Sequence, residues 1–225
     1  MPPMMITLKH GHPWKVTPAE AVGIQERLRQ LVVAHDGLAG VRAVAGLDVG
    51  IREGRARAAL VVLSYPALER LGEAVAERPV EFPYVPGLLT FREGPVALEA
   101  LERLATPWDV LLCDGQGYAH PRRLGIASHL GVLLDRPSVG CAKSRLVGSH
   151  GEVGDEPGSW AELVDRGEVV GAALRTRRGV KPVFVSVGHR IDLAGAIELV
   201  LACTRNRRLP EPARLAHQLA SGGAK

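Results

Sequence analysis

The first regular pattern of apolar residues in the chain has the spacing of an amphipathic helix. Ala21, Ile24 and Leu28 lie three or four residues apart, with charged and polar residues between them. Thr17 and Pro18 precede this pattern, and they are typical of a helix start, because threonine caps a first turn and proline is tolerated at the first helical position. The pattern therefore predicts a helix that begins near residue 18.

Three runs with strand character follow, and turn residues separate them. They cover residues 41–49, 58–64 and 69–76. Glu53-Gly54 favours a tight turn between the first two runs, so we expect an antiparallel meander. Residues 79–87 contain three prolines, which remove backbone donors and break regular structure. A helix opened by Gly94-Pro95 is expected after them.

The second half of the chain alternates helices and strands. Residues 110–113 are continuously apolar, as a buried parallel strand is. The other expected elements are a helix over 126–134, strands over 138–142, 169–175 and 183–187, a helix after Asp192 and a last helix near Pro212. We therefore predict one α/β domain over residues 1–225, with its core at about 17–220 between short flexible tails. Its mixed sheet, an antiparallel meander followed by parallel strands, would be flanked by helices.

Composition excludes several classes of protein. Hydrophobic residues make up 46% of the chain and charged residues 23%, which is ordinary for a globular protein. No apolar run reaches the roughly 20 residues that span a bilayer, and the first ten residues lack the pattern of a secretory signal. Cys113, Cys141 and Cys203 show no zinc or disulfide spacing. We therefore expect a cytoplasmic protein with buried thiols and no membrane partner.

Positive charge is concentrated in the C-terminal quarter. The chain carries 28 basic and 24 acidic residues, a net charge of +4. From Gly171 onward there are ten basic and three acidic residues, a net charge of +7, which leaves −3 for the first 170 residues. This asymmetry indicates a polyanionic partner such as nucleic acid, and a solvated arginine-rich surface is the alternative.

Two aspartates stand at the ends of apolar strands. Asp48 follows Val44-Ala45-Gly46-Leu47, and Asp114 follows Val110-Leu111-Leu112-Cys113. If the two strands are neighbours, the carboxylates lie close together and repel each other unless a cation binds between them. Hard cations such as Mg²⁺ prefer oxygen ligands of this kind. The pair therefore predicts a metal site, although either aspartate alone is more typical of a residue that begins a loop or caps a helix.

Two loops offer groups that could bind a ligand. Gly115 and Gly117 allow backbone amides after Asp114 to approach a ligand closely, and Arg122 and Arg123 are candidate phosphate ligands. A purely structural turn is the alternative for this loop. Tyr84 lies between Pro83 and Pro86, where a stiff loop can hold a ring that inserts into a base stack. A tyrosine that packs onto the core is the alternative there.

Six segments in this order resemble the endonuclease V family, the deoxyinosine-directed nucleases. They are Ala45-Gly-Leu-Asp48, Pro83-Tyr-Val-Pro-Gly-Leu-Leu-Thr-Phe-Arg-Glu93, Asp114-Gly-Gln-Gly-Tyr-Ala-His-Pro-Arg-Arg-Leu-Gly125, Pro137-Ser-Val-Gly-Cys-Ala-Lys143, Gly188-His-Arg190 and Arg208-Leu-Pro-Glu-Pro-Ala-Arg214. The resemblance runs from about Thr17 to His217, nearly the whole chain. It implies a ribonuclease H-like fold, in agreement with the order of elements predicted above.

The resemblance also implies the roles of particular residues. Asp48, Asp114 and Glu93 would bind Mg²⁺, for which Mn²⁺ substitutes. His217 would complete the site, with a packing or capping histidine as the alternative, and Lys143 would neutralise the phosphate near the cut. The resemblance implies that a further set of residues contacts the substrate: Tyr84 as a strand-separating wedge, with Gly87, Gly115, Gly117, His120 and Arg122 around the deaminated base.

The implied activity is a DNA repair endonuclease. It would recognise deoxyinosine in duplex or single-stranded DNA and hydrolyse the second phosphodiester bond 3′ to the lesion, leaving 3′-hydroxyl and 5′-phosphate ends. A ribonuclease that acts on inosine-containing RNA is the alternative within the same chemistry. A non-cleaving nucleic-acid-binding protein is the alternative from another class.

Overall fold

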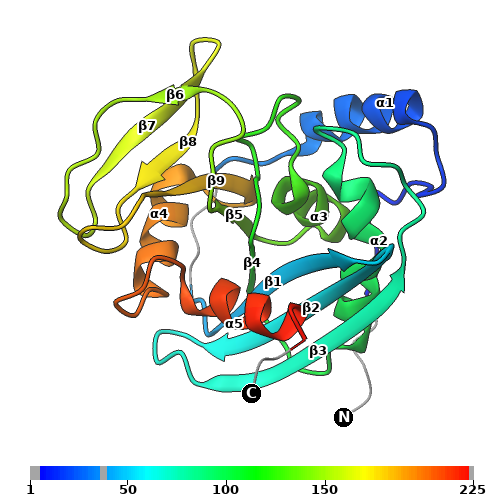
Figure 1. The fold of residues 1–225 in the computed structure, drawn as a ribbon, viewed down its shortest axis with the longest axis horizontal. Helices are drawn as coiled ribbons and strands as arrows, with labels where there is room; N and C mark the ends of the chain where they lie inside the picture. The colour runs from blue at the N-terminus through cyan, green and yellow to red at the C-terminus, as the bar shows by residue number, and fades with distance from the viewer. Residues whose placement is uncertain (1–5, 36–39, 223–225) are drawn as a thin grey trace.

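A mixed β-sheet of nine strands runs through the part of the chain that the structure describes, which is residues 6–35 and 40–222 of a computed structural model (Figure 1). The strands are β1 (Ala43–Arg52), β2 (Arg55–Ser64), β3 (Arg70–Pro79), β4 (Val110–Cys113), β5 (Ser138–Ala142), β6 (Ser149–His150), β7 (Trp160–Asp165), β8 (Glu168–Leu174) and β9 (Val183–His189). They lie side by side in the order β3-β2-β1-β4-β5-β9-β8-β7-β6.

The pairing of these strands confirms the predicted ribonuclease H-like arrangement. β1, β2 and β3 form an antiparallel meander, and β1, β4 and β5 are parallel neighbours. The Glu53-Gly54 turn joins β1 to β2 with positive φ angles of 48° and 73°, as the central residues of a two-residue type I′ hairpin turn require. β9 then continues the sheet antiparallel to β5, and β8, β7 and β6 follow it in antiparallel pairs.

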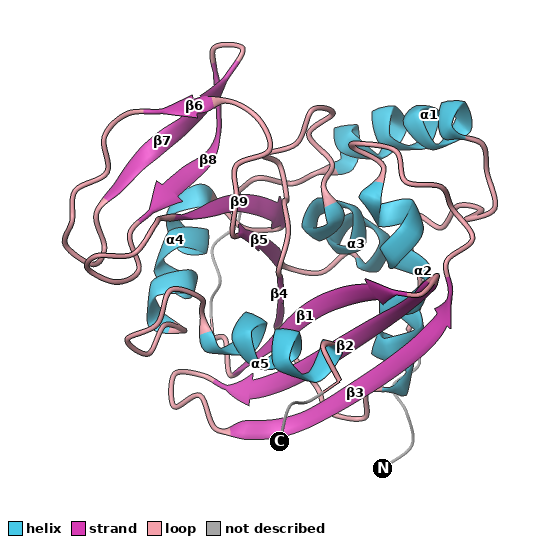
Figure 2. Ribbon diagram, in the orientation of Figure 1, coloured by secondary structure: helices cyan, strands magenta, loops and turns pink. Residues whose placement is uncertain are grey.

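Helices cover both faces of the sheet (Figure 2). They are α1 (Pro18–Leu28), which a 3₁₀ turn over Arg29–Leu31 extends, α2 (Leu89–Arg103), α3 (Ile126–Leu134), α4 (Leu193–Ala202) and α5 (Glu211–Ala220). Apolar residues of α1, α2 and α3 form one core with alternate strand residues such as Leu47 and Leu111. Residues of α4 and α5 form a second core on the opposite face with Val44 and Leu112. The three cysteines are buried, as predicted.

The start of α2 differs from its prediction. The helix begins at Leu89, five residues before Gly94, and Pro95 lies inside it. Phe91 and Leu88 are almost completely buried at this end of the helix. Their burial outweighs the one backbone hydrogen bond that Pro95 removes. As a result, Glu93 lies on a helix and not on the preceding loop.

Strands β6 and β7 were not predicted. They lie at the edge of the sheet, and of the residues in β7 only Leu163 is buried, so the apolar signal of this hairpin is weak.

Among the described residues, no helix combines the length and the apolar character that crossing a bilayer requires.

The packed body extends further toward the N-terminus than the predicted boundary at residue 17. The amide of Lys9 donates to the carbonyl of Leu133 in α3. The Nε2 atoms of His12 and His129 lie 2.7 Å apart, and the ring of Trp14 stacks on that of His129. Residues 9–14 therefore cover α3. The outermost residues of both predicted tails lie outside the described ranges.

Candidate active site

The three parallel strands bring the predicted charged residues together, although Asp48 lies within β1 and not at a strand end as predicted, because β1 continues to Arg52 in its pairing with β2. Leu47 in β1 pairs with Cys113 in β4, so the aspartates that follow these two residues are neighbours. The amide of Asp114 donates to the carbonyl of Leu47 at 2.9 Å, which continues the ladder beyond β4. Lys143 directly follows β5, the parallel neighbour of β4. The condition on which the predicted metal site depended, that the two strands are neighbours, is therefore met.

Helix α5 brings a histidine to the same edge from the face opposite α2. His217 Nδ1 lies 2.9 Å from Asp48 Oδ2. Asp48, Asp114 and His217 each offer one ligand atom, and the three atoms lie within 4.8 Å of one another. This spacing allows one small cation to contact all three side chains.

Burial and mutual repulsion disfavour the charged forms of the acids in this cluster. The Asp114 side chain is only 8% exposed, and burial, assisted by the charge of Asp48, raises its pKa although Lys143 opposes the shift. Lys143 Nζ lies 2.6 Å from Asp114 Oδ2. Burial and then the charge of Asp48 raise the pKa of Glu93 to about 8. Glu93 is outside the group of three, but it is near enough to interact with both aspartates. An added positive charge would stabilise all of these carboxylates.

Two loops predicted to contact the substrate are joined by hydrogen bonds. Arg122 donates from Nη2 to the carbonyl of Gly87 at 2.6 Å and from Nε to Oε1 of Gln25 at 2.5 Å. Gln25 in turn donates to the carbonyl of Gly87 at 3.0 Å. The amide of Arg122 donates to Nδ1 of His120, which is buried. Burial, together with the charge of Arg122, lowers the pKa of His120 to about 4. The loop around residue 87 is therefore fixed to the loop that follows Asp114.

The side chain of Tyr84 is not part of these hydrogen bonds between the two loops. It is 72% exposed, and the only ring contact described for it is the guanidinium of Arg92, 5.6 Å from the ring centroid. Tyr84 therefore does not pack onto the core, and that alternative is wrong.

The chain resembles known proteins along nearly its whole length. The model of the Endonuclease V family matches residues 26–218. This chain belongs to the endonuclease V family. Endonuclease V of Roseiflexus sp. strain RS-1 is 56% identical over 211 residues, which are 94% of this chain and 95% of that one.

Solved endonuclease V structures share the fold. The crystal structure of the Streptomyces avermitilis protein matches with a TM-score of 0.89 at 44% identity and covers 97% of each chain. Endonuclease V of Ciona intestinalis matches with a TM-score of 0.80 at 32% identity, over 92% of this chain and 98% of that one. That protein was crystallised with a 23mer DNA containing an inosine followed by a ribo-adenosine. As an endonuclease V, the chain is a nuclease, which is a hydrolase.

In this endonuclease V, the two glycines after Asp114 have different surroundings. Gly117 is buried, and its amide donates to Oγ of Ser186 at 2.9 Å. A Cβ atom on Gly117 would lie 2.1 Å from the carbonyl oxygen of Val187, so glycine is required for the loop to reach β9. Gly115 is half-buried, and a Cβ atom on it would lie 2.7 Å from Cγ2 of Ile126, a side-chain atom. Of the two, Gly115 is the one nearer to solvent.

The side chain of Arg123 forms ion pairs with two acids. Its guanidinium donates to Asp165 and Glu168, both at 2.8 Å, and its side chain is 9% exposed. The suggestion that Arg123 binds phosphate is therefore wrong, because both acids already neutralise it. Arg123 instead joins the loop after Asp114 to the β7–β8 hairpin.

Two residues with a clear part in this endonuclease V site were not predicted. Arg208 donates to the carbonyls of Lys143, Lys181 and Pro182 at 2.5, 2.9 and 3.0 Å, and so it fixes the backbone of the lysine beside Asp114. Arg208 begins one of the six family-like segments, but nothing in the pattern indicates the carbonyls that it contacts. Gln25 lies in α1, and a helical glutamine carries no signal of this kind.

Proposed function

We propose that this chain is a magnesium-dependent DNA repair endonuclease that recognises deoxyinosine and hydrolyses the second phosphodiester bond 3′ to it. The products would carry 3′-hydroxyl and 5′-phosphate ends. The observation that carries the proposal is the convergence of Asp48, Asp114 and His217 within 4.8 Å, with Lys143 at 2.6 Å from Asp114. Membership of the endonuclease V family and the inosine-containing DNA bound by the Ciona relative support the choice of substrate.

The residues present fit a hard divalent cation. Two carboxylates supply oxygen ligands. Burial and then the charge of Asp48 raise the pKa values of Asp114 and Glu93, and a bound positive charge would stabilise the charged forms of both. We therefore propose Asp48 and Asp114 as the ligands, with Glu93 as the third acid, and Mg²⁺ as the ion, for which Mn²⁺ substitutes. When bound, such an ion polarises the scissile phosphate and activates water as the nucleophile.

The side chains around these acids have separate tasks in the proposed reaction. Lys143 supplies a positive charge beside Asp114, where it offsets the negative charge of the scissile phosphate. His217 donates or accepts a proton at Nδ1 with Asp48, and because the ring is 48% exposed, its other nitrogen can hold the water that attacks phosphorus.

Base recognition is assigned to the two joined loops. The exposed ring of Tyr84 would enter the base stack, and the extruded base would bind near Gly87, Gly115 and His120. Hypoxanthine has a carbonyl acceptor where adenine has an amine donor, so a backbone N–H directed at this position favours the deaminated base. Arg122 holds Gly87 in place for this contact. Gly117 keeps the second loop close to β9, so its part in recognition is to place the loop.

The variant Asp114→Asn tests the metal site. It should lower nicking of a labelled deoxyinosine duplex in Mg²⁺ by about a hundredfold or more, since one ligand charge is lost, while DNA affinity in Ca²⁺ or EDTA stays within about threefold. Asp192→Asn is the matched control, because Asp192 caps α4 and asparagine caps equally well. Nicking by Asp114→Asn at the rate of the control would refute the assignment. Wild-type protein that leaves the duplex intact in Mg²⁺, in Mn²⁺ and in EDTA would instead indicate a non-cleaving binding protein.

Inosine-containing RNA is the second candidate substrate. The DNA in the Ciona complex carries a ribonucleotide directly after inosine, so that relative accommodates one 2′-hydroxyl there. Cleavage of matched oligonucleotides with deoxyinosine or inosine at one position decides between the two substrates. We expect the DNA strand to be cut faster.

A further inference from the structure

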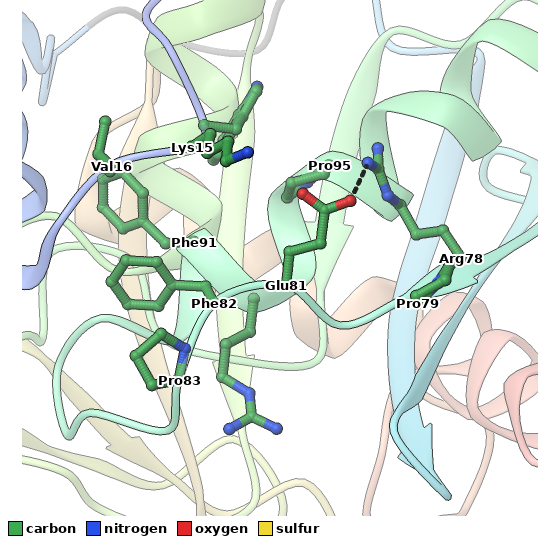
Figure 3. A pocket seen from close by; sticks show the side chains of 11 residues that line it. Lys15, Val16, Arg78, Pro79, Glu81, Phe82, Pro83, Phe91 and Pro95 are labelled. Carbon is green, nitrogen blue, oxygen red and sulfur yellow. Dashed lines mark hydrogen bonds and ion pairs between the residues drawn. The ribbon is translucent and has the colours of Figure 1, made fainter.

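A pocket lined by both aromatic and charged residues lies beside the segment that leads to Tyr84. It has a volume of about 340 Å³, within the range of ligand pockets, and we call it the Trp14 pocket. Its wall is formed by the N-terminal segment, the end of β3, the loop before Tyr84 and the first turns of α2 (Figure 3). The lining residues that matter here are Trp14, Lys15, Arg78, Phe82, Phe91 and Arg92.

Aromatic rings form the apolar side of the Trp14 pocket. The centroids of Phe82 and Phe91 are 5.4 Å apart, and Trp14 meets Phe91 edge to face at 5.8 Å. The two phenylalanines are almost fully buried, whereas Trp14 is half-buried and keeps part of its ring surface accessible. Figure 3 shows Phe82 and Phe91 side by side below Lys15. A flat ring that enters here would meet an aromatic surface.

Positive charge surrounds this aromatic surface. Three basic residues and one acid, Glu81, line the pocket, and Glu81 is paired with Arg78 at 3.5 Å. Lys15 is exposed, and Arg92 Nε is a buried donor without a hydrogen-bond acceptor among the described residues. A buried donor of this kind is stabilised by an acceptor from a ligand. Glu81 offsets the charge of Arg78, so the positive charges of Lys15 and Arg92 are available to a ligand such as a phosphate.

The pocket adjoins both parts of the proposed DNA site. Arg92 lines the pocket, its guanidinium lies over the ring of Tyr84, and Glu93 is the next residue in α2. Phe82 and Pro83 line the pocket directly before Tyr84 in the chain. A nucleic-acid strand separated by Tyr84 therefore has this pocket beside it.

We propose that the Trp14 pocket binds one nucleotide that the Tyr84 ring displaces from the stack, with its base against Trp14 and its phosphate at Lys15 and Arg92. The inference rests on the proposed function, and it adds a second nucleotide site to the one for the deaminated base. The displaced nucleotide can come from the lesion strand or from the complementary strand, and both offer the same chemistry. It increases affinity because stacking and a phosphate contact are gained together.

The first test measures DNA affinity. Lys15→Ala is compared with Arg70→Ala, because Arg70 is an exposed basic residue on β3 that pairs with Glu73 and does not line the pocket. Binding of a deoxyinosine duplex is measured by anisotropy in Ca²⁺ at several salt concentrations. Lys15→Ala should weaken binding about three- to tenfold and lower the slope of log K against log salt by about one. Arg70→Ala should match wild-type protein. Equal affinities and slopes for Lys15→Ala and Arg70→Ala would overturn the proposal.

The second test reports contact inside the pocket. A base that stacks on Trp14 quenches its fluorescence, so quenching upon DNA binding should be reduced by at least half in Trp14→Phe, and retained in Trp160→Phe. Quenching that is the same in Trp14→Phe and wild-type protein refutes the pocket. If Trp14→Phe reduces the quenching by duplex DNA but not the quenching by the single lesion strand, the displaced nucleotide comes from the complementary strand. If it reduces the quenching by both DNAs, the nucleotide comes from the lesion strand. Wild-type protein that neither binds nor nicks deoxyinosine DNA would refute the proposed function itself.

Discussion

The packing of α5 on β1 makes a sharp prediction about Gly46. Alternate residues of β1 face this helix in register: Gly46 meets Pro212, Asp48 meets His217 and Gly50 meets Ala220. A Cβ atom on Gly46 would lie 2.1 Å from the carbonyl oxygen and 2.2 Å from the carbonyl carbon of Pro212. Both atoms belong to the backbone, so no side chain can rotate to make room. We therefore expect Gly46→Ala to displace α5.

The size of the effect follows from this distance. Ordinary contacts begin at 3.4 Å, so α5 has to move away from β1 by about 1.3 Å. Overpacking of this kind costs about 1–3 kcal/mol, which lowers Tm by about 2–12 °C in a chain of this length. Because α5 also carries His217, the same movement separates it from Asp48. A displacement of about 1 Å at a catalytic group lowers the rate up to a hundredfold.

Thermal unfolding and nicking of a deoxyinosine duplex measure the two effects. Gly50→Ala is the matched control, since it lies on the same strand and faces the same helix, but its added Cβ would be 3.6 Å from the carbonyl oxygen of Ala220. It should change Tm by less than about 2 °C and leave nicking unchanged. The reasoning fails if Gly46→Ala unfolds at the same temperature and nicks at the same rate as Gly50→Ala.

Two further variants test residues around the site. Arg208→Lys should lower the nicking rate about tenfold with a smaller change in KM, because a lysine cannot donate to all three carbonyls that Arg208 contacts, including that of Lys143. The control Arg205→Lys alters an arginine that donates to the carbonyl of Ala67 and should nick at the wild-type rate. Equal nicking rates for the two variants would show that Arg208 is dispensable. His120 has a pKa lowered to about 4, below the value of about 6.5 in an unfolded chain, so the unfolded state binds its proton first and stability is lost as pH falls from about 6.5 to 4, by up to about 3 kcal/mol. Urea unfolding at several pH values should therefore show a flatter profile for His120→Asn than for wild-type protein, and parallel profiles would contradict the assignment.

The acids at the sheet edge were predictable because the signal is local. Asp48 and Asp114 each interrupt a continuous apolar run, and a charge at the end of a buried strand requires a partner. The sequence left open whether β1 and β4 are neighbours, and the pairing of Leu47 with Cys113 shows that they are. The residue types therefore predicted the acids, and the strand pairing brings them together.

Contacts between distant segments were not predictable in the same way. Arg208 acts on carbonyl groups, and every residue has one, so its partners have no signature in the sequence. Gln25 reaches the carbonyl of Gly87 only because α1 packs beside the loop. The start of α2 was missed for a related reason: the tertiary burial of Phe91 outweighs the local preference for proline at a helix start.

The site therefore combines parts of different rigidity. Asp48 lies within β1, and Asp114 and Lys143 directly follow its parallel neighbours β4 and β5, so the ladder fixes the spacing of all three. Glu93 and His217 come from helices on opposite faces of the sheet, and each depends on a separate hydrophobic core. Loosening the core under α2 should affect Glu93 and Tyr84 together, because both are attached to that face. Loosening the core under α5 should displace His217 and should reach the proposed metal site through the contact between His217 and Asp48.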